Sequence, residues 1–192
     1  YVLENITVDD SLNFLIEAQN DALLSHCLAR IGSWRLALMA LRSALENTLF
    51  YLYYKDHNVE LSLWQMGKHN IHIADYETYI ERHPKFVKID AKTSGKKILK
   101  KEYNILSKAV HASSVKFRMT DEDYFPALTL PDLPHLNQWI AREKETLKLI
   151  NQLMITMFND HIQGAKLQNL RKTISLTIPK CLHLDIKKEL DV

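Results

Sequence analysis

The sequence predicts an all-α protein, a helical bundle built on a long antiparallel helical hairpin with two further main helices. Of 192 residues only 4 are Gly and 5 are Pro, the residues that turns between short strands need. Apolar residues also recur three or four apart over long stretches, which is the period of amphipathic helices. The chain is 46% hydrophobic and 25% charged, the usual balance of a folded globular protein.

The first two expected helices form the hairpin. Asp9 and Asp10 are suitable caps for a helix over residues 11–31. Its apolar stripe, expected to face the core, is Leu12, Leu15, Ile16, Leu23, Cys27 and Ile31. Gly32 and Ser33 then break the helix before a second one over residues 34–55. The apolar seam of this second helix, typical of a helix packed antiparallel on its neighbour, is Trp34, Leu38, Leu41, Leu45, Thr48 and Leu52.

The rest of the chain supplies the two further main helices. Short helical pieces are expected at 59–66 and 75–82, the latter ended by Pro84. A clear helix over 95–112 precedes a proline-rich loop over 113–134, and a long helix over 135–162 follows. We expect residues 1–165 to form the bundle and 166–192 to form a C-terminal helical extension packed on it.

One face of the helix over 95–112 is rich in cations. Opposite its apolar residues, steps of four and three align Lys97, Lys101, Asn104, Lys108 and His111. The following loop adds Lys116 and Arg118. This face is either a solvated surface or a contact for phosphate, RNA or an acidic partner. Lysines crowd the helix N-terminus, where the macrodipole disfavours each cation by ~0.3–1 kcal/mol, which favours a bound anion.

Composition excludes several other functions. A net charge of 25 − 23 = +2 does not by itself imply nucleic-acid binding. Cys27 and Cys181 lie far apart, which argues against a disulfide framework and favours a reducing, cytoplasmic location. No membrane span is expected, because no run of eighteen apolar residues occurs. His69 and His72 have metal-ligand spacing but no persuasive third ligand, so no metal is expected. The sequence contains no glycine-rich loop of the kind that binds phosphate, and no cofactor is expected.

Two segments resemble HEPN domains (higher eukaryotes and prokaryotes nucleotide-binding). The segment 103–113 contains Leu-Ser-x-x-Val-His, ending at His111, and resembles the end of the third HEPN helix. Residues 41–47 are similar to the second helix of some HEPN-like proteins. With the helix order, the resemblance covers roughly residues 10–165. It implies a bundle that often dimerises, in many members a ribonuclease active across the dimer, and an antiphage, antiviral-defence or toxin role on or near RNA or nucleotides.

The ribonuclease motif of that family is incomplete in this chain. It requires Arg, four to six residues, and then His, but the corresponding places before His111 hold Asn104, Ile105 and Leu106. Lys108 or Arg42 would have to replace the arginine, with Glu46 beside Arg42. The resemblance therefore implies a catalytic group of His111, Lys108, Arg42 and Glu46, and phosphate contacts at Lys97, Lys101, Asn104, Lys116 and Arg118.

Three functions remain open at this point. The first is a catalytically degenerate HEPN-like domain that acts on or near RNA or nucleotides. The second is a non-enzymatic helical interaction module within a larger assembly, and the third is a nucleotide sensor that uses the lysine face. A homodimer or a second protein subunit is the expected partner.

Overall fold

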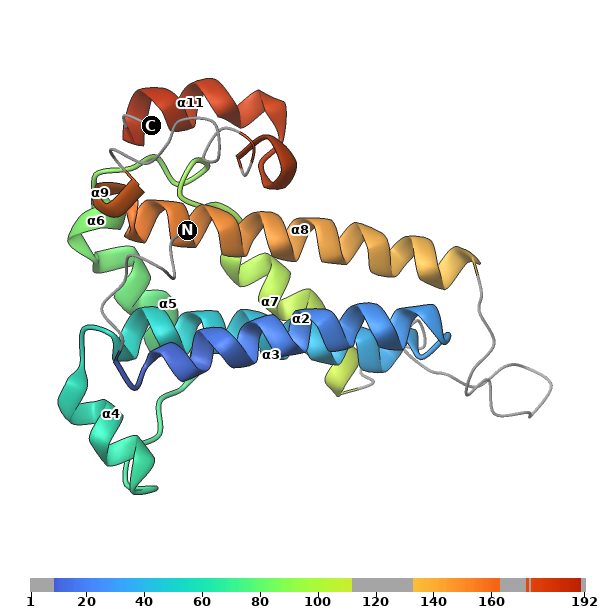
Figure 1. The fold of residues 1–192 in the computed structure, drawn as a ribbon, viewed down its shortest axis with the longest axis horizontal. Coiled ribbons are helices and arrows are strands. Elements are labelled where there is room, and N and C mark those ends of the chain that lie inside the picture. Colours follow the sequence, from blue (N-terminus) through green and yellow to red (C-terminus); the bar gives the residue numbers. More distant parts are fainter. Residues whose placement is uncertain (1–8, 112–132, 163–171, 173, 191–192) are drawn as a thin grey trace. The chain divides into compact units, whose positions relative to one another are not determined.

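The computed structural model describes residues 9–111, 133–162, 172 and 174–190, and every regular element in these ranges is a helix (Figure 1). The all-α prediction is therefore confirmed for the described part of the chain. The helices are α2 (Leu12–Arg30), α3 (Trp34–Tyr54), α4 (Asn58–Gln65), α5 (Ile73–Arg82), α6 (Pro84–Val87), α7 (Lys96–Val110), α8 (Leu133–Met157), α9 (Asn159–Ile162) and α11 (Lys180–Leu190). Within the described ranges, no helix has both the length and the apolar character that crossing a bilayer requires.

The chain divides into two compact units. The first, which we call the hairpin unit, comprises Asn13–Tyr51 and Lys101–Thr146. The second, which we call the α11 unit, comprises Tyr1–Leu12, Leu52–Lys100 and Leu147–Val192. The domain boundary expected between residues 165 and 166 lies outside the described residues.

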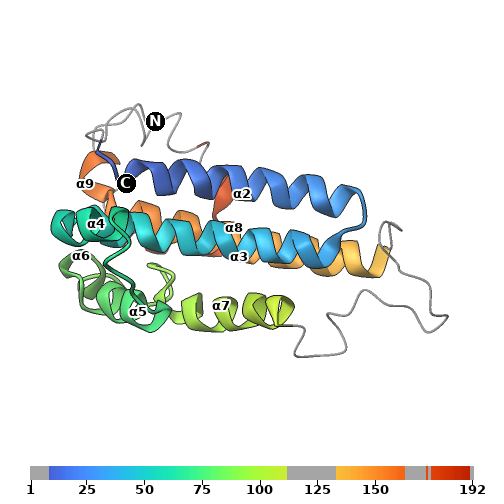
Figure 2. The same ribbon diagram turned by 90° about the horizontal axis from the view of Figure 1, so that it is seen from below.

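Helices α2 and α3 run antiparallel side by side and form the predicted hairpin (Figures 1 and 2). Gly32 ends α2 because it adopts a φ of +82°, a left-handed conformation that glycine tolerates best. Its N–H bonds the carbonyl of Ala29 at 3.1 Å, and the N–H of Ser33 bonds the carbonyl of Leu28 at 2.9 Å. These two bonds satisfy the last carbonyls of α2 and turn the chain into α3.

The two helices differ in how well their core faces were predicted. All six seam residues of α3 are buried, so that prediction is confirmed. The stripe predicted for α2 is wrong for four of its six residues: Ile16, Leu23 and Ile31 are 46%, 61% and 53% exposed and Cys27 is exposed, while Leu12 and Leu15 are half-buried. The buried residues of α2 are instead Phe14, Ala18, Ser25 and Ala29.

Hydrogen bonding explains why a serine occupies the inner face of α2. The Ser25 hydroxyl is fully buried; it donates to the carbonyl of Ala37 at 2.7 Å and accepts from Trp139 Nε1 at 2.9 Å. Ser25 therefore joins α2 to α3 and to α8 and satisfies the buried indole N–H. Small residues on this face also allow the helices to approach closely, so a larger leucine would both overfill the contact and remove these bonds.

The long helix predicted over residues 135–162 is interrupted. α8 ends at Met157 and α9 begins at Asn159, with the buried Phe158 between them. The side chain of Asn159 accepts from the N–H of Asp160 at 2.9 Å. Asparagine side chains that bond the local backbone compete with helical bonding, which gives a physical reason for the interruption.

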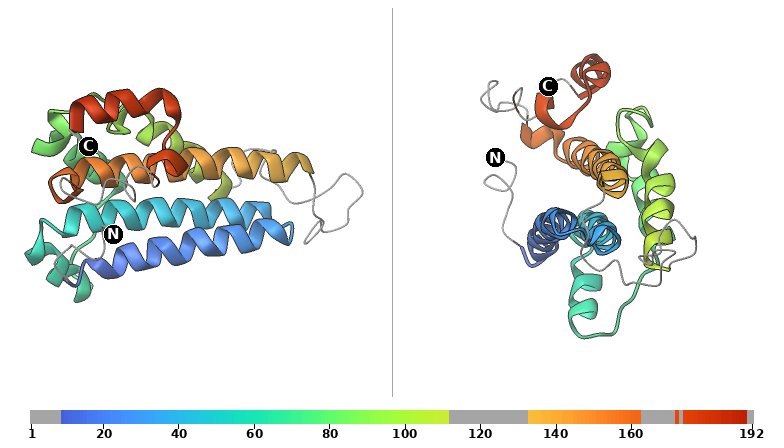
Figure 3. Two further views of the ribbon diagram at one scale, coloured as in Figure 1. Left: turned by 45° about the horizontal axis from the view of Figure 1, so that its top comes forward. Right: turned by 90° about the vertical axis from the view of Figure 1, so that its right-hand side faces the viewer.

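In the α11 unit, α11 packs along the C-terminal part of α8 (Figure 3). The apolar cluster at this contact consists of Ile89, Ile155, Ile178, Leu182, Ile186 and Leu190. Glu189 adds polar bonds, since its carboxylate accepts from the N–H of Asp90 at 2.9 Å and from the hydroxyl of Thr93 at 3.3 Å. Gly95, with φ +85°, precedes α7 where a Cβ atom would lie 3.0 Å from the Leu149 side chain, so a larger residue does not fit there.

Candidate functional site

The hairpin unit presents an exposed polar face along α7. Lys101, Asn104, Lys108 and His111 are all exposed, and their steps of three, four and three place them on one side of the helix. We call these four residues the α7 face. Lys97 is also exposed but belongs to the α11 unit. Lys116 and Arg118 lie outside the described residues.

The α7 face is cationic because the acidic residue of its helix points away from solvent. Glu102 is 4% exposed, and its carboxylate accepts from Arg142 at 2.8 Å and from the hydroxyl of Thr146 at 3.2 Å. Arg142 therefore neutralises the Glu102 charge inside the unit. Among the described residues, no carboxylate forms an ion pair with Lys101 or Lys108, so both ammonium groups remain available to an external anion.

Arg42 and Glu46 form a closed network with Tyr103. The Arg42 guanidinium donates to Glu46 Oε1 at 2.8 Å and to the Tyr103 hydroxyl at 2.7 Å. That hydroxyl in turn donates to Glu46 Oε1 at 2.8 Å. The guanidinium also lies 5.1 Å from the centroid of the Tyr103 ring. Each residue of the network is thus bonded to the other two within the hairpin unit, while the buried Nε of Arg42 has no hydrogen-bond partner among the described residues.

Ionisation in this network follows from those contacts. Burial alone would lower the pKa of Arg42, but the hydrogen bond from Arg42 to Tyr103 and the charge of Glu46 outweigh it and raise that pKa. Burial is the main cause of the raised pKa of Tyr103, against the opposing effect of Arg42. The network is therefore a partly buried ion pair with a neutral phenol, an arrangement that fixes α3 against α7.

The structure thus separates the expected catalytic group into two places. Arg42 and Glu46 meet at Tyr103, whereas Lys108 and His111 lie at the end of α7. Tyr103 precedes His111 by eight residues, roughly 12 Å along the helix axis. No contact among the described residues joins Arg42 or Glu46 to His111.

The arginine next to the end of α7 is Arg35, which the sequence analysis did not single out. Its Nε donates to the carbonyl of Ala109 at 2.9 Å, and its Nη2 donates to the carbonyl of Val110 at 3.1 Å. A cation there stabilises the negative end of the helix dipole directly before His111. Sequence spacing gave no signal for this residue, because α3 brings Arg35 to His111 across more than seventy residues of chain.

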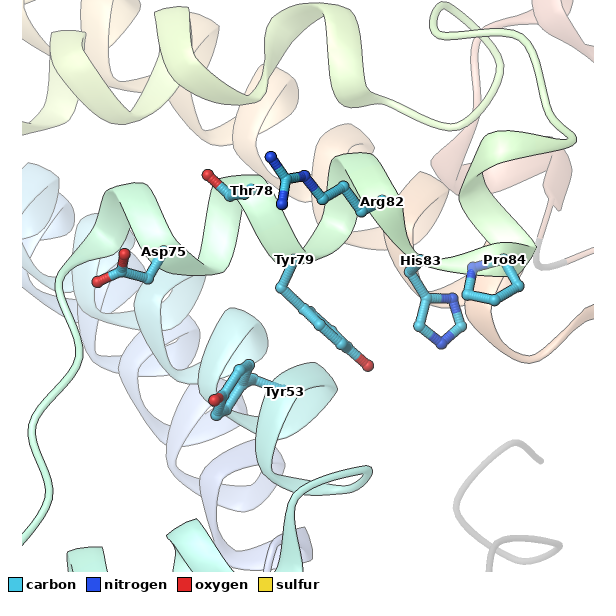
Figure 4. Close-up of a pocket in the computed structure, with 7 residues that line it drawn as sticks. All are labelled: Tyr53, Asp75, Thr78, Tyr79, Arg82, His83 and Pro84. Atoms are coloured by element: carbon cyan, nitrogen blue, oxygen red, sulfur yellow. The ribbon is translucent and has the colours of Figure 1, made fainter.

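The α11 unit contains a second polar constellation, an open cleft of about 400 Å³ along α5 (Figure 4). Its lining residues are Tyr53, Asp75, Thr78, Tyr79, Arg82, His83 and Pro84. Tyr79 and His83 extend from α5 on the side of Tyr53, while the Arg82 guanidinium lies beside Thr78 (Figure 4). The Tyr53 ring stacks on His57 with centroids 3.9 Å apart.

Asp56 contacts two of the residues that line this cleft, Tyr79 and His83. Its Oδ2 accepts from the Tyr79 hydroxyl at 2.5 Å and lies 3.1 Å from His83 Nε2. Burial opposes ionisation of Asp56, but the Tyr79 hydrogen bond, with Lys55 and His83, lowers its pKa below the usual value. Burial, with the hydrogen bond to Asp56, raises the pKa of Tyr79.

His83 is unsuited to acid–base chemistry in this arrangement. Its Nδ1 accepts from the N–H of Lys85 at 3.2 Å, so its Nε2 must carry the proton that is donated to Asp56. Both ring nitrogens are therefore occupied, one of them in capping α6. The Asp56, Tyr79 and His83 group joins the end of α3 to α5 and α6, and we interpret it as structural.

The two histidines with metal-ligand spacing have other contacts. His69 Nδ1 lies 3.2 Å from the Tyr54 hydroxyl, and the backbone N–H of His72 donates to Asp75 at 3.1 Å at the start of α5. Within the described residues, no group of three His, Cys, Asp or Glu side chains is arranged to hold a metal ion.

Comparison of the chain with models of protein families, with curated proteins and with solved structures gave no match.

Proposed function

We propose that this chain is a HEPN-like helical domain that binds RNA through the α7 face and does not cleave it. The observation that carries the proposal is the burial of Glu102 against Arg142, while Lys101 and Lys108 are exposed and form no ion pair with a carboxylate of the described residues. The defence or toxin context implied by the resemblance belongs to the same proposal.

The α7 face has the chemistry that a nucleic-acid backbone requires. Lys101 and Lys108 stand seven residues apart, roughly 10 Å along the helix, so each can meet a separate phosphate. Asn104 lies between them and offers both a donor and an acceptor to a sugar or base edge. Counterions released from the strand on binding would favour association most at low salt.

The absence of cleavage follows from the state of the arginines. Arg42 donates to Glu46 and Tyr103, and Arg35 donates from its Nε and Nη2 to two carbonyls at the end of α7. Neither guanidinium therefore offers its Nε–Nη2 edge to a scissile phosphate for the two parallel bonds that make arginine effective in this role. His111 alone supplies proton transfer without the stabilisation of charge that the reaction needs.

The test is the salt dependence of binding to a fluorescent single-stranded RNA, measured by anisotropy. For single strands the slope of log K against log salt is about −0.7 per phosphate contact, so Lys101→Gln/Lys108→Gln should make the slope shallower by about 1.4. The control is Lys187→Gln/Lys188→Gln, which removes the same charge from exposed lysines of α11. Superimposable lines for the two variants would show that α7 makes no specific contribution.

A helical interaction module is the second candidate function. The exposed apolar residues of α2 favour it, since Ile16, Leu23 and Ile31 lie on the side of that helix opposite its core face. If the α7 face bound an acidic protein and not RNA, the anisotropy assay would show no RNA binding by the wild-type chain.

A further inference from the structure

The open cleft along α5, which we call the α5 cleft, belongs to the α11 unit and shares no residue with the α7 face (Figure 4). Its volume of about 400 Å³ is large enough for a small organic molecule. Steps of three and four along the helix place Asp75, Thr78 and Arg82 on the side of α5 that lines it. The cleft thus presents a carboxylate, a hydroxyl and a guanidinium beside two tyrosine rings, which suits a charged ligand with an apolar part.

Three polar groups of the α5 cleft have bonding capacity that the unit does not use. Asp75 accepts from the N–H of His72 through Oδ2, and no described residue bonds its Oδ1. The Thr78 hydroxyl donates its hydrogen to the carbonyl of Ala74 at 2.8 Å, so it can only accept from a ligand. Arg82 is exposed, and its guanidinium forms neither an ion pair nor a hydrogen bond with a described residue.

The spacing of these groups determines which ligand fits. Arg82 follows Thr78 by four residues and its guanidinium lies beside that residue, while Asp75 precedes Thr78 by three residues (Figure 4). The two opposite charges are therefore about one helical turn apart, roughly 5 Å along the axis. An α-amino acid carries its ammonium and its carboxylate on one carbon atom, so it matches opposite charges this close together. A mononucleotide matches less well, because the Asp75 carboxylate repels a phosphate bound to Arg82.

We propose that the α5 cleft binds a free α-amino acid with an apolar or aromatic side chain. The ammonium group of the ligand donates to Asp75 Oδ1 and to the Thr78 hydroxyl. Its carboxylate accepts two parallel bonds from the Arg82 guanidinium, the geometry in which arginine binds carboxylates most strongly. The side chain of the ligand lies against the rings of Tyr53 and Tyr79.

The aromatic wall of the cleft is fixed by contacts within its own unit. Tyr79 donates its hydroxyl hydrogen to Asp56 at 2.5 Å, and the Tyr53 ring stacks on His57 with centroids 3.9 Å apart. The two tyrosine rings meet at an interplanar angle of 78°, with centroids 5.2 Å apart, and so form a corner. Because both rings already have fixed positions, burying an apolar side chain against them costs little conformational entropy.

The first experiment titrates the full chain with L-phenylalanine and L-leucine and follows two-dimensional amide NMR spectra. A small ligand in an open cleft binds weakly, so concentrations up to tens of millimolar are required. The shifts should be confined to α5 and the end of α3. Phenylpropionate lacks the ammonium, phenethylamine lacks the carboxylate and glycine lacks the side chain, so each should bind about tenfold more weakly than phenylalanine.

Three results of this titration would overturn the proposal. The first is the absence of shifts along α5 with both amino acids. The second is equal affinity for phenylalanine and phenylpropionate, because the ammonium would then make no contact. The third is tighter binding of adenosine monophosphate than of phenylalanine, which would assign the cleft to a nucleotide.

The second experiment repeats the phenylalanine titration with single variants. Arg82→Gln and Asp75→Asn should each weaken binding about tenfold, because each removes one charged partner of the ligand. Asp75→Asn keeps an oxygen that can accept from the N–H of His72, so the start of α5 is preserved. The matched control is Lys88→Gln, an exposed cation of the same unit outside the cleft, which should bind as the wild type does. If Arg82→Gln bound phenylalanine as tightly as this control, the proposed carboxylate contact would be wrong.

Discussion

Replacing Arg142 by methionine tests the buried ion pair that makes the α7 face cationic. Methionine keeps much of the apolar stem of arginine but removes the guanidinium that bonds Glu102 at 2.8 Å. Glu102, 4% exposed, then retains the hydroxyl of Thr146 at 3.2 Å as its remaining hydrogen-bond partner in this contact. The variant therefore removes the cation that faces a buried carboxylate.

The expected loss of stability in Arg142→Met follows from the burial of the two partners. Removing one partner of a buried ion pair usually costs about 3–5 kcal/mol. Because the Arg142 side chain is 28% exposed, water reaches part of this site, and we expect the free energy of unfolding to fall by about 2–3 kcal/mol. For a chain of this length that corresponds to a melting temperature lower by about 4–12 °C. Adding Glu102→Gln should restore part of the loss, because the buried group that faced Arg142 is then neutral.

The assay is urea unfolding followed by far-UV circular dichroism for both single variants and the double variant. Lys144→Met is the matched control, since it removes an exposed cation from the same helix and should change stability by less than about 0.5 kcal/mol. If Arg142→Met were as stable as this control, or the double variant were less stable than Arg142→Met, the ion pair would not have the role that its geometry indicates.

Three further outcomes are expected. Because the folded-state pKa of Asp56 is lowered, its stabilisation is present above the unfolded pKa and is lost as pH falls through the folded pKa. Thermal melts from about pH 6 to pH 3 should therefore fall less steeply for Asp56→Asn than for the wild type. Arg35→Met should destabilise the end of α7 by about 1–2 kcal/mol, seen as faster amide hydrogen exchange before His111. Purified chain should leave single-stranded RNA intact, and cleavage that disappears in His111→Ala would contradict this expectation.

Sequence periodicity predicted α3 better than α2 for a physical reason. One broad face of α3 is buried, so large apolar residues such as Leu41 and Leu45 coincide with the core. The core face of α2 instead carries Ala18, Ser25 and Ala29. These residues are small or polar, so they add little to a periodic pattern of large apolar residues. The larger residues of α2 are on the other side, and a pattern of apolar spacing cannot tell which of two apolar faces meets the same chain.

The candidate site was predictable where it depends on one helix and not where it depends on several. Steps of three and four were sufficient to place Lys101 and Lys108 on an exposed face of α7. They carried no information about Arg35, whose contact with α7 depends on how α3 packs. The pairing of Glu102 with Arg142 likewise links residues forty positions apart, so sequence alone could not show that the acid of α7 is neutralised.

The predicted stripe of α2 and the expected role of Arg42 both depend on the assumption that a polar or apolar face has one neighbour. The HEPN resemblance implied that Arg42 could replace the missing arginine of the motif, yet its Nη2 already bonds Tyr103 and Glu46. Leu23 was expected to serve the core because it is apolar, yet the core is complete without it. A polar side chain that already has hydrogen-bond or ion-pair partners in its own unit is a poor candidate for binding another molecule. An apolar side chain that its unit leaves exposed is a better candidate. By that criterion the exposed apolar residues of α2, and the lysines of α7 that form no ion pair within the described residues, are the better candidates for contacts with other molecules.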